Sequence, residues 1–369
     1  MSRKIKLLNV VGARPNFMKM APLIREMNKK RDRIEHILIH TGQHYDNDMS
    51  GNFIDQLGMP RPKINLGVGS GSHAEQTAKI MIAFEKAIIE HRPDLVVVVG
   101  DVNSTIACAL VASKMGVRIA HVEAGLRSFD RNMPEEINRV LTDALSDYLF
   151  TTEKSAHVNL QNEGIAKEKI FFVGNVMIDT LVHSLEKIRD WELPFRGVEE
   201  NKYAVVTLHR PSNVDHPGTL ANILEAFCAI NEKIALILAL HPRTLKNIEL
   251  FGMSDKLNVI RGRGIVVGPI GYLEMLKLTK SAKFVITDSG GLQEETTYLG
   301  IPCITMRENT ERPITITCGT NILVGKDTNA LSANCDEILR GRFKTGSIPE
   351  LWDGKASERI IDKLLSAKY

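Results

Sequence analysis

The chain has 369 residues, of which 43% are hydrophobic and 25% are charged, and its formal net charge is +3. This length is typical of two globular domains. The weak net charge argues against a nucleic-acid partner, and no stretch approaches the roughly 18 apolar residues of a membrane span. The first residues form a strand pattern without the features of a signal peptide, so we expect a cytoplasmic protein.

The five cysteines predict neither disulfides nor a zinc site. Their number is odd, none forms a C-x-x-C pair, and most lie inside apolar runs. A thiol in such a run is usually a small core side chain, so the pattern is typical of a reducing compartment.

Short apolar runs alternate with helical patterns along the first half of the chain. The expected strands cover residues 5–11, 34–40, 95–99, 118–122, 148–151 and 170–173. The expected helices cover residues 22–30, 73–91, 103–114 and 134–146. Strands that alternate with helices in this way predict a parallel, doubly wound sheet.

The alternation restarts after a linker near residues 190–202. Strands are expected at 203–208, 235–240, 284–287 and 303–306, with short extended pieces at 259–261 and 265–267. Helices are expected at 219–231, 273–280, 293–299 and 356–369. The sequence therefore predicts an α/β protein of two Rossmann-like domains with an interdomain cleft for a ligand.

Polar residues cluster where predicted strands end, which is where parallel sheets build their sites. After the first strand, Gly12 frees the turn, and Arg14 and Lys19 place two cations at a helix start that already favours anions. We expect these two residues to bind an anionic group, with simple surface charge as the alternative. The loop is not a G-x-G-x-x-G fingerprint, so it does not support a dinucleotide cofactor.

The loop after the second strand carries His40, Gln43, His44 and Asp46. These residue types could hold a metal ion, but their spacing matches no common zinc pattern. We therefore expect a structural or substrate-side polar cluster in this loop, and no metal.

Carboxylates follow two further strands and begin a helix. Asp101 follows the strand at 95–99, Glu123 ends the next strand, and Glu135 and Glu136 begin a helix. One such acid is often only a helix cap, but three acid sites at one edge of a sheet would raise one another's proton affinity. This arrangement predicts a general acid and a general base in one pocket, while one of the adjacent glutamates could serve only as a helix-dipole partner.

Two histidines follow strands in the second half of the chain. His209 lies beside Arg210, and His241 comes after the next strand. A histidine in such a place is a candidate phosphate ligand or acid–base group, and a buried structural histidine is the alternative.

The strongest single signal is the segment Ser289-Gly290-Gly291 between a buried strand and a helix. Small residues at this point let backbone N–H groups approach a diphosphate. Glu295 lies about one helical turn further on, where its carboxylate could bind both hydroxyls of a ribose. Arg312 lies in the loop after the next strand and adds a cation.

The order of these motifs resembles the non-hydrolysing UDP-N-acetylglucosamine 2-epimerases. The matching segments are, in chain order, GARPNFMK, TGQHYD, GDVNST, HVEAGLRS, PEEINR, GNVMID, LHRPSN, HPRT, DSGGLQEE and TERP. They run from Gly12 to about Gly325 and cover nearly the whole chain. The resemblance implies the GT-B architecture, with domains at residues 1–175 and 176–355 and a last helix, 356–369, that returns to the first domain.

The resemblance further implies interconversion of UDP-GlcNAc and UDP-ManNAc. In that reaction the C2 proton leaves as UDP departs from C1, which gives 2-acetamidoglucal, and UDP then adds back as a proton reaches the opposite face. The chemistry needs no NAD and no metal ion, and relatives are usually homodimers. It requires an acid and a base on opposite faces of the sugar, and cations at the departing diphosphate.

The resemblance also assigns roles to residues. The acid–base residues it implies are Asp101, Glu123 and Glu135, with His209 as a helper at the diphosphate or leaving oxygen. The residues it implies for UDP are Arg14, Lys19, His209, Ser289, Gly290, Gly291, Glu295 and Arg312. Relatives that bind a second UDP-GlcNAc as an activator use residues that Gln43 and His241 match, whereas Asp46 departs from that pattern and argues against strong activation.

Three alternatives remain open on the sequence. They are a 2-epimerase of a modified sugar such as UDP-2,3-diacetamido-glucuronic acid, a GT-B glycosyltransferase, and a non-enzymatic nucleotide-sugar sensor. The segment Thr310-Glu311-Arg312-Pro313 favours the GlcNAc enzyme, because relatives that act on the modified sugar tend to lack the Arg-Pro pair.

Overall fold

The structure is a computed structural model that describes residues 3–43 and 54–367. It divides into two compact units. The first unit runs to Ser184 and takes in the chain again from Glu350, and the second comprises Leu185–Pro349. Each unit contains one parallel sheet covered by helices.

The unit boundaries differ from those predicted after residues 175 and 355. The first boundary falls within helix α7 (Val176–Lys187), and most of this helix belongs to the first unit. One reason is a hydrogen bond from the Thr180 hydroxyl of α7 to the Met18 carbonyl, at 2.6 Å. On the other side, Trp352 is buried in the first unit and donates to the Thr152 carbonyl at 3.0 Å, so the return to this unit precedes the last helix.

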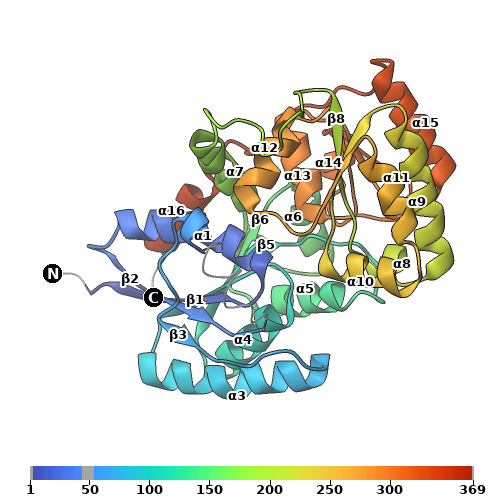
Figure 1. Ribbon diagram of the computed structural model, residues 1–369. Helices are drawn as coiled ribbons and strands as arrows, with labels where there is room; N and C mark the ends of the chain where they lie inside the picture. Colours follow the sequence, from blue (N-terminus) through green and yellow to red (C-terminus); the bar gives the residue numbers. More distant parts are fainter. Residues whose placement is uncertain (1–2, 44–53, 368–369) are drawn as a thin grey trace. The chain divides into compact units, whose positions relative to one another are not determined.

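The first unit is built on a parallel sheet of seven strands in the order β3-β2-β1-β4-β5-β6-β7. Its strands are β1 (Ile5–Val11), β2 (Ile34–His40), β3 (Ile64–Asn65), β4 (Leu95–Val99), β5 (Arg118–Ala124), β6 (Tyr148–Thr151) and β7 (Ile170–Phe172). Its helices are α1 (Arg14–Lys29), α3 (His73–His91), α4 (Asn103–Lys114), α5 (Pro134–Leu145), α6 (Lys154–Asn162), α7, α16 (Ala356–Ser366) and the 3₁₀ helix η1 (Lys167–Lys169). Helices α1 and α16 lie over one face of this sheet, and α3 and α4 lie over the other (Figure 1).

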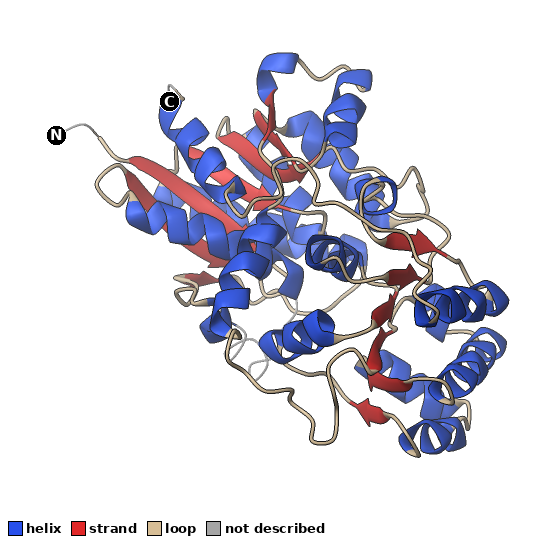
Figure 2. Ribbon diagram, turned by 90° about the horizontal axis from the view of Figure 1, so that it is seen from above, coloured by secondary structure: helices blue, strands red, loops and turns tan. Residues whose placement is uncertain are grey.

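The second unit repeats the design with six parallel strands in the order β10-β9-β8-β11-β12-β13. Its strands are β8 (Tyr203–Thr207), β9 (Ala235–Ala239), β10 (Ile265–Val267), β11 (Phe284–Thr287), β12 (Cys303–Thr305) and β13 (Asn321–Leu323). Its helices are α8 (Pro211–Val214), α9 (Pro217–Asn231), α10 (Pro242–Leu250), α11 (Ser254–Arg261), α12 (Tyr272–Ser281), α13 (Gly290–Leu299), α14 (Ile314–Thr317) and α15 (Thr328–Leu339). Figure 2 shows both sheets in red with blue helices beside them, and the prediction of two doubly wound α/β sheets is confirmed.

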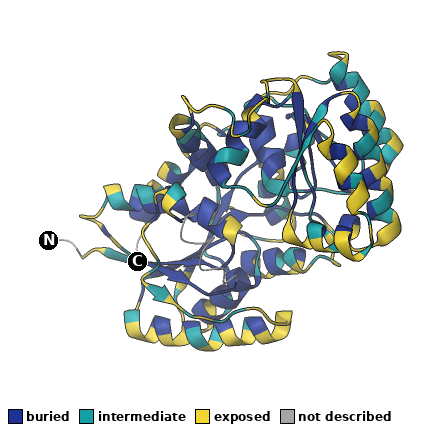
Figure 3. Ribbon diagram, in the orientation of Figure 1, coloured by how far each residue is buried: buried dark blue, intermediate teal, exposed yellow. Residues whose placement is uncertain are grey.

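Burial follows the pattern that the sequence predicts. All five residues of β4 are buried, as expected for an apolar run in the middle of a parallel sheet. Figure 3 shows many of the strands in dark blue and yellow positions along the outer sides of the helices, whereas β10 is of intermediate burial throughout. Within the described part of the chain, every helix lacks the length and apolar character that crossing a membrane requires.

Helix α1 begins at Arg14, well before the start predicted at residue 22, and Pro22 lies inside it. Proline normally ends a helix because it has no N–H to donate to the carbonyl four residues earlier. That carbonyl belongs to Met18, and it accepts the Thr180 hydroxyl at 2.6 Å instead. The proline is tolerated because a second helix supplies the missing hydrogen bond.

The short extended piece predicted at 259–261 is wrong, because these residues end helix α11. Leu257 and Ile260 are both buried and lie on one face of this helix, which packs against α9. A short apolar run fits a strand or a buried helix equally well, so its periodicity alone could not decide.

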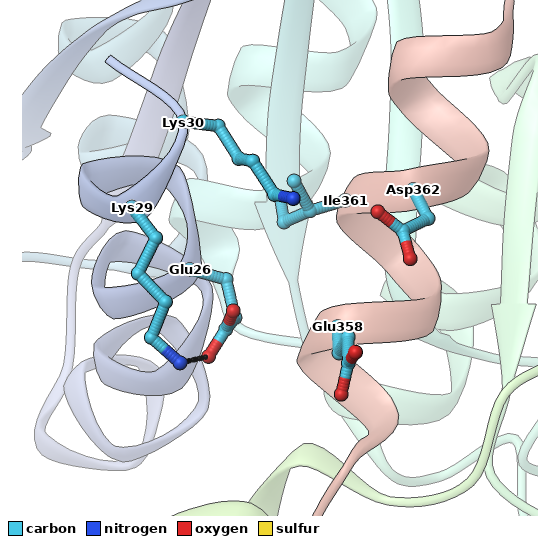
Figure 4. A pocket seen from close by; sticks show the side chains of 6 residues that line it. All are labelled: Glu26, Lys29, Lys30, Glu358, Ile361 and Asp362. Carbon is cyan, nitrogen blue, oxygen red and sulfur yellow. Dashed lines mark hydrogen bonds and ion pairs between the residues drawn. The ribbon is translucent and has the colours of Figure 1, made fainter.

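Helix α16 packs against α1 within the first unit. The Asp179 carboxylate accepts hydrogen bonds from the backbone N–H groups of Ala356 and Ser357, at 3.0 and 2.7 Å, so α7 satisfies the first turn of α16. Figure 4 shows a pocket between α1 and α16 that is lined mainly by charged side chains, among them Lys30 and Asp362. None of the residues predicted for the site lines this pocket.

The bond that compensates for Pro22 can be tested by a double-mutant cycle. Thr180→Val keeps the side-chain shape but leaves the buried Met18 carbonyl without a donor, which should lower the free energy of unfolding by about 1–3 kcal/mol. In a Pro22→Ala background the new N–H can donate to Met18, so the same substitution should cost clearly less. Denaturant unfolding would measure both costs, with Thr77→Val on α3 as the control, and equal costs in the two backgrounds would contradict this explanation.

Candidate active site

The carboxyl ends of β1, β4 and β5 carry the polar residues predicted for the first unit. Strand β4 pairs with β1 on one side and with β5 on the other, so the loops that follow these strands lie side by side at one edge of the sheet. The strand order reverses between β1 and β4, which is where open parallel sheets bind their ligands. The topology therefore gathers the predicted acids at the position where a ligand is expected.

Asp101 follows β4 and is held by two residues of α5. The Arg139 Nε donates to Asp101 Oδ2 at 3.0 Å, and the Asn138 amide donates to the Asp101 carbonyl at 2.9 Å. The Arg139 side chain is buried, whereas the Asp101 side chain is 24% exposed. Asp101 is thus a fixed, charge-paired carboxylate that still reaches the surface.

The adjacent glutamates at the start of α5 have different surroundings. Glu136 is buried, pairs with Arg139, and accepts the backbone N–H groups of Ser128 and Phe129 at 3.0 and 2.9 Å. Glu135 is half-buried. Glu136 therefore holds the loop after β5 in place, while Glu135 remains the candidate for acid–base chemistry.

Glu123 lies at an irregularity near the end of β5, and its φ of +73° falls in the left-handed region that side-chain-bearing residues rarely adopt. Its carboxylate accepts a hydrogen bond from the Lys19 ammonium, and both side chains are almost fully buried. Gly100 makes this contact possible, because a Cβ at that position would lie only 2.8 Å from Lys19 Nζ. The structure thus pairs Lys19 with Glu123, and a role for this lysine in binding an anionic group stays a prediction.

Arg14 is exposed at the first position of α1. The turn before it is held by Asn16, whose Oδ1 accepts the N–H groups of Gly12 and Ala13 at 3.2 and 3.0 Å and whose Nδ2 donates to the Val99 carbonyl at 3.0 Å. The start of α1 is therefore tied to the end of β4. Arg14 lies at a helix start that favours anions, as predicted.

Gln43 is buried beside the start of α4. Its Oε1 accepts the Ser104 backbone N–H at 3.2 Å and the Ser104 hydroxyl at 2.6 Å. A role for Gln43 in binding a second substrate molecule stays a prediction. His44 and Asp46 lie outside the described residues, and among the residues that are described no three His, Cys, Asp or Glu side chains come together as metal ligands.

In the second unit, the predicted site begins with His209, which follows β8. Its Nδ1 lies 2.7 Å from Asp288 Oδ1, and Asp288 also accepts the backbone N–H groups of His209 and Arg210, at 2.9 and 2.8 Å. Burial raises the pKa of Asp288, but the His209 ring and these N–H groups outweigh it and hold the pKa below its usual range. Asp288 is fully buried while the His209 side chain is 40% exposed, so the carboxylate orients an imidazole that a ligand can reach.

The Ser289-Gly290-Gly291 turn leads from β11 into α13, with Ser289 as the N-cap. A Cβ on Gly290 would lie 2.7 Å from Arg312 Nη1, so glycine allows the turn to approach this guanidinium. Arg312 Nε lies 2.9 Å from Glu294 Oε1, and its Nη1 pairs with Glu311. Arg312 is therefore beside the turn, as predicted, but two glutamates already balance its charge.

Glu295 and His241 complete the predicted set. Glu295 lies in α13 and is 4% exposed. The His241 ring lies 5.8 Å from the His209 ring, and its Nδ1 accepts the Arg243 backbone N–H at 3.1 Å as the N-cap of α10. Burial lowers the pKa of His241, and the neighbouring His209 and Arg243 lower it further. His241 therefore favours the neutral form beside His209.

Two residues that organise these clusters, Asp288 and Arg139, were not singled out from the sequence. Asp288 directly follows a buried strand, which is the signal that drew attention to Asp101. Thr207 and Thr287 are register partners in neighbouring strands, so the residues after them come together. That adjacency follows from strand order, which the sequence pattern alone did not give.

Comparison with known proteins decides the family. A family model described as UDP-N-acetylglucosamine 2-epimerase matches residues 26–365. The chain belongs to this family.

Relatives of this epimerase-family protein match it over their full lengths. A UDP-N-acetylglucosamine 2-epimerase of Methanocaldococcus jannaschii is 46% identical over 371 residues, which covers 99% of this chain and 100% of the relative. A UDP-2,3-diacetamido-2,3-dideoxy-D-glucuronate 2-epimerase of Pseudomonas aeruginosa is 42% identical over 363 residues, covering 98% of this chain and 99% of the relative. Members with different named substrates are thus similarly close to this chain.

Solved structures agree with the family assignment. The Methanocaldococcus jannaschii UDP-GlcNAc 2-epimerase in complex with UDP-GlcNAc and UDP has a TM-score of 0.90 and 44% identity, covering 98% of this chain and all 100% of that one. A lipopolysaccharide outer core galactosyltransferase has a TM-score of 0.54 at 13% identity. The second likeness shows a shared fold and nothing about activity.

The Asp288 contacts predict a pH-dependent contribution to stability. Asp288→Asn keeps the shape but removes the charge, so the free energy of unfolding at neutral pH should fall by about 2 kcal/mol. Because the pKa of Asp288 is lowered in the folded protein, its contribution is present above its unfolded pKa and is lost as the pH falls through the folded value. The difference between the two proteins should therefore shrink below about pH 4.

Denaturant unfolding followed by circular dichroism over that pH range would measure this difference. The matched control is Asp255→Asn at an exposed position of α11, which should change little at any pH. A constant difference between neutral and acid pH would argue against an ionised Asp288.

Proposed function

We propose that this protein interconverts UDP-GlcNAc and UDP-ManNAc as a non-hydrolysing 2-epimerase. The observation that carries the proposal is the 46% identity to the Methanocaldococcus jannaschii UDP-N-acetylglucosamine 2-epimerase over 99% of the chain. The acids at the ends of β4 and β5 support it, because inversion at C2 requires proton transfer to and from carbon.

The proposed reaction has two halves. In the first, a carboxylate removes the C2 proton, the electron pair of the C2–H bond forms the C1–C2 double bond, and the bond from C1 to the UDP oxygen breaks. In the second, UDP adds back to C1 of 2-acetamidoglucal while a carboxylic acid delivers a proton to the other face of C2. Elimination and addition leave the oxidation level of the sugar unchanged, so we expect no cofactor to be consumed.

We assign the proton transfers to residues of the first unit. Asp101 and Glu123 lie at the ends of adjacent strands, and Glu135 begins the helix that also supplies Arg139. Each of the two acids has a cation beside it: Arg139 Nε lies 3.0 Å from Asp101 Oδ2, and the Lys19 ammonium contacts the Glu123 carboxylate. Lys19 pairs with Glu123 in this arrangement, and we keep it among the residues proposed to bind UDP.

We assign UDP binding mainly to residues of the second unit. The N–H groups at the start of α13, after the Ser289-Gly290-Gly291 turn, suit a diphosphate, and Glu295 suits the ribose. His209 is committed to Asp288 through Nδ1, which leaves Nε2 for a phosphate or leaving oxygen. Arg14 and Arg312 remain the arginines proposed for the diphosphate, and the Arg312 guanidinium lies beside the Gly290 turn.

A second candidate substrate is UDP-2,3-diacetamido-glucuronic acid. The observation that favours it is the 42% identity to the Pseudomonas aeruginosa enzyme that is named for this sugar. The chemistry at C2 is the same, so only the groups around the substituents of the sugar would differ. The two candidates are separated by incubating the protein with each nucleotide sugar.

The test is incubation with UDP-GlcNAc in deuterated water, followed by NMR. We expect UDP-ManNAc to appear and deuterium to enter at C2, because the returning proton comes from a group that exchanges with solvent. Turnover of the diacetamido sugar alone would select the second candidate. Absence of C2 exchange with both sugars would overturn the proposal in either form.

In the same assay, Asp101→Asn and Glu123→Gln should each reduce turnover at least ~100-fold, the usual scale for a general acid or base. UDP should still bind to both variants, which equilibrium titration can check. Glu249→Gln at an exposed position of α10 is the control and should leave turnover unchanged. Near-normal turnover in both site variants would refute the assignment of the acids.

We also propose that the protein is a homodimer in which a second copy covers the outer side of α3 and α5, which flank α4. On α3, Ile82 and Ile89 are 62% and 59% exposed, and on α5, Ile137 and Leu141 are 47% and 50% exposed. These residues lie in helical register along each helix, and large apolar side chains gathered in this way are typical of a protein–protein interface.

Substitution on this face tests the dimer. Ile82→Lys combined with Leu141→Lys should convert the protein to monomers, because two lysines per copy would lose their hydration in the interface. Sedimentation velocity would measure the change of mass. Val259→Lys on α11 is the control, since Val259 is 61% exposed but lies in the second unit, and an unchanged mass in the double variant would exclude this face.

A further inference from the structure

His121, in the middle of β5, contacts two hydrogen-bond acceptors at once. Its Nδ1 lies 2.6 Å from Asp143 Oδ1, and its Nε2 lies 2.8 Å from the Gly100 carbonyl oxygen. The histidine and the aspartate are both fully buried. Because the ring is enclosed, these two partners have to satisfy its nitrogens.

The two contacts determine the protonation state of the ring. A neutral imidazole has one N–H and one lone pair, and a carbonyl oxygen has no hydrogen to give. A neutral His121 would therefore direct a lone pair at an acceptor oxygen within hydrogen-bond distance. Protonation of both nitrogens removes this conflict, so the contacts are those of an imidazolium.

Asp143 supplies the opposite charge. Its Oδ2 lies 2.7 Å from Arg127 and accepts the Gly125 backbone N–H at 3.1 Å. Burial raises the pKa of Asp143, but the adjacent His121 and Arg127 outweigh it and bring the pKa below its usual range. Arg127 in turn pairs with Glu163 at 2.6 Å. Two cations, His121 and Arg127, therefore face two carboxylates, and the network ends at Glu163, which is partly exposed.

The bonds made by this pair reach both sides of the proposed acids. Gly100 immediately precedes Asp101, and the backbone at Gly100 is in the left-handed region, with φ +66°. Gly125 lies two residues after Glu123, and its N–H is fixed by the carboxylate that also holds His121. The pair thus connects the end of β4 to the irregular end of β5.

We propose that His121 is a positioning residue for the 2-epimerase reaction, a buried imidazolium that fixes the Gly100 carbonyl and, through Asp143, the Gly125 N–H, and so holds Asp101 and Glu123 in register. This inference rests on the proposed function of those two acids. His121 touches no substrate in this account and acts only through the backbone on either side of them.

Substitution at position 121 tests the role. In His121→Gln the amide nitrogen can replace Nε2 and keep the bond to Gly100, whereas in His121→Asn it can replace only Nδ1 and keep the bond to Asp143. We expect turnover to fall about 10- to 100-fold in the asparagine variant, the scale of a misplacement near 1 Å, and less in the glutamine variant. The Kd for UDP should stay within about twofold of the wild-type value in both variants, which corresponds to a change in binding free energy below about half a kcal/mol.

His157→Gln, at a half-buried position on α6 of the same unit, is the matched control and should leave turnover unchanged. A general loss of folding would lower turnover and UDP binding together, whereas a positioning defect lowers turnover alone. Wild-type turnover in the asparagine variant, or equal losses of turnover and UDP binding, would overturn the inference.

A spectroscopic measurement needs no variant of His121. In ¹⁵N-histidine-labelled wild-type protein at neutral pH, both ring nitrogens of His121 should carry a proton, with the signal assigned by its absence in His121→Gln. A single bound proton would overturn the inference. If Asp101→Asn and Glu123→Gln keep their turnover, the assignment of the acids fails instead, whereas the measured protonation state of His121 does not depend on that assignment.

Discussion

Charge pairing by buried cations is the interaction on which the polar edge of the first sheet depends. Arg139 faces Asp101 and Glu136, and Lys19 faces Glu123. A buried carboxylate without a partner would cost several kcal/mol, so acids can lie at the ends of buried strands only because these cations meet them there. Since Arg139 comes from α5 and Lys19 from α1, the packing of those helices on the sheet sets the positions of the acids.

Backbone geometry limits which residues could make these contacts. Gly100 leaves room for the Lys19 ammonium, and Glu123 adopts a positive φ where the register of β5 shifts. Such a conformation costs on the order of 1–3 kcal/mol and persists only where surrounding contacts enforce it. The pair with Lys19 and the Gly125 N–H bound by Asp143 are contacts of this kind, so the strain at Glu123 and the charge network belong to one arrangement.

Much of this architecture could be predicted from the sequence, because the strands and helices of a parallel sheet are consecutive segments of the chain and each has its own local pattern. The apolar run of β4 predicted a central strand, and acids directly after strands predicted where side chains meet. The pairing of Lys19 with Glu123 could not be predicted, because it joins residues 104 positions apart. Helix α1 was predicted too short because Pro22 normally ends a helix, and its compensation by Thr180 comes from a helix 162 residues away. Local sequence patterns predict the helices and strands, whereas these pairings depend on tertiary contacts between distant parts of the chain.

The two histidine–aspartate pairs differ in the burial of the histidine, and this difference determines what each histidine can do. In the first unit His121 and Asp143 are both fully buried, and each ring nitrogen is used by the protein, so the pair can fix a backbone but cannot exchange a proton with a ligand. In the second unit Asp288 is equally buried, but the His209 side chain is 40% exposed. The same pair of residue types therefore leaves the imidazole accessible in one unit and encloses it in the other. His121 lies within β5 and His209 just after β8, but exposure is the property that distinguishes the two roles, and exposure is set by what packs over each ring.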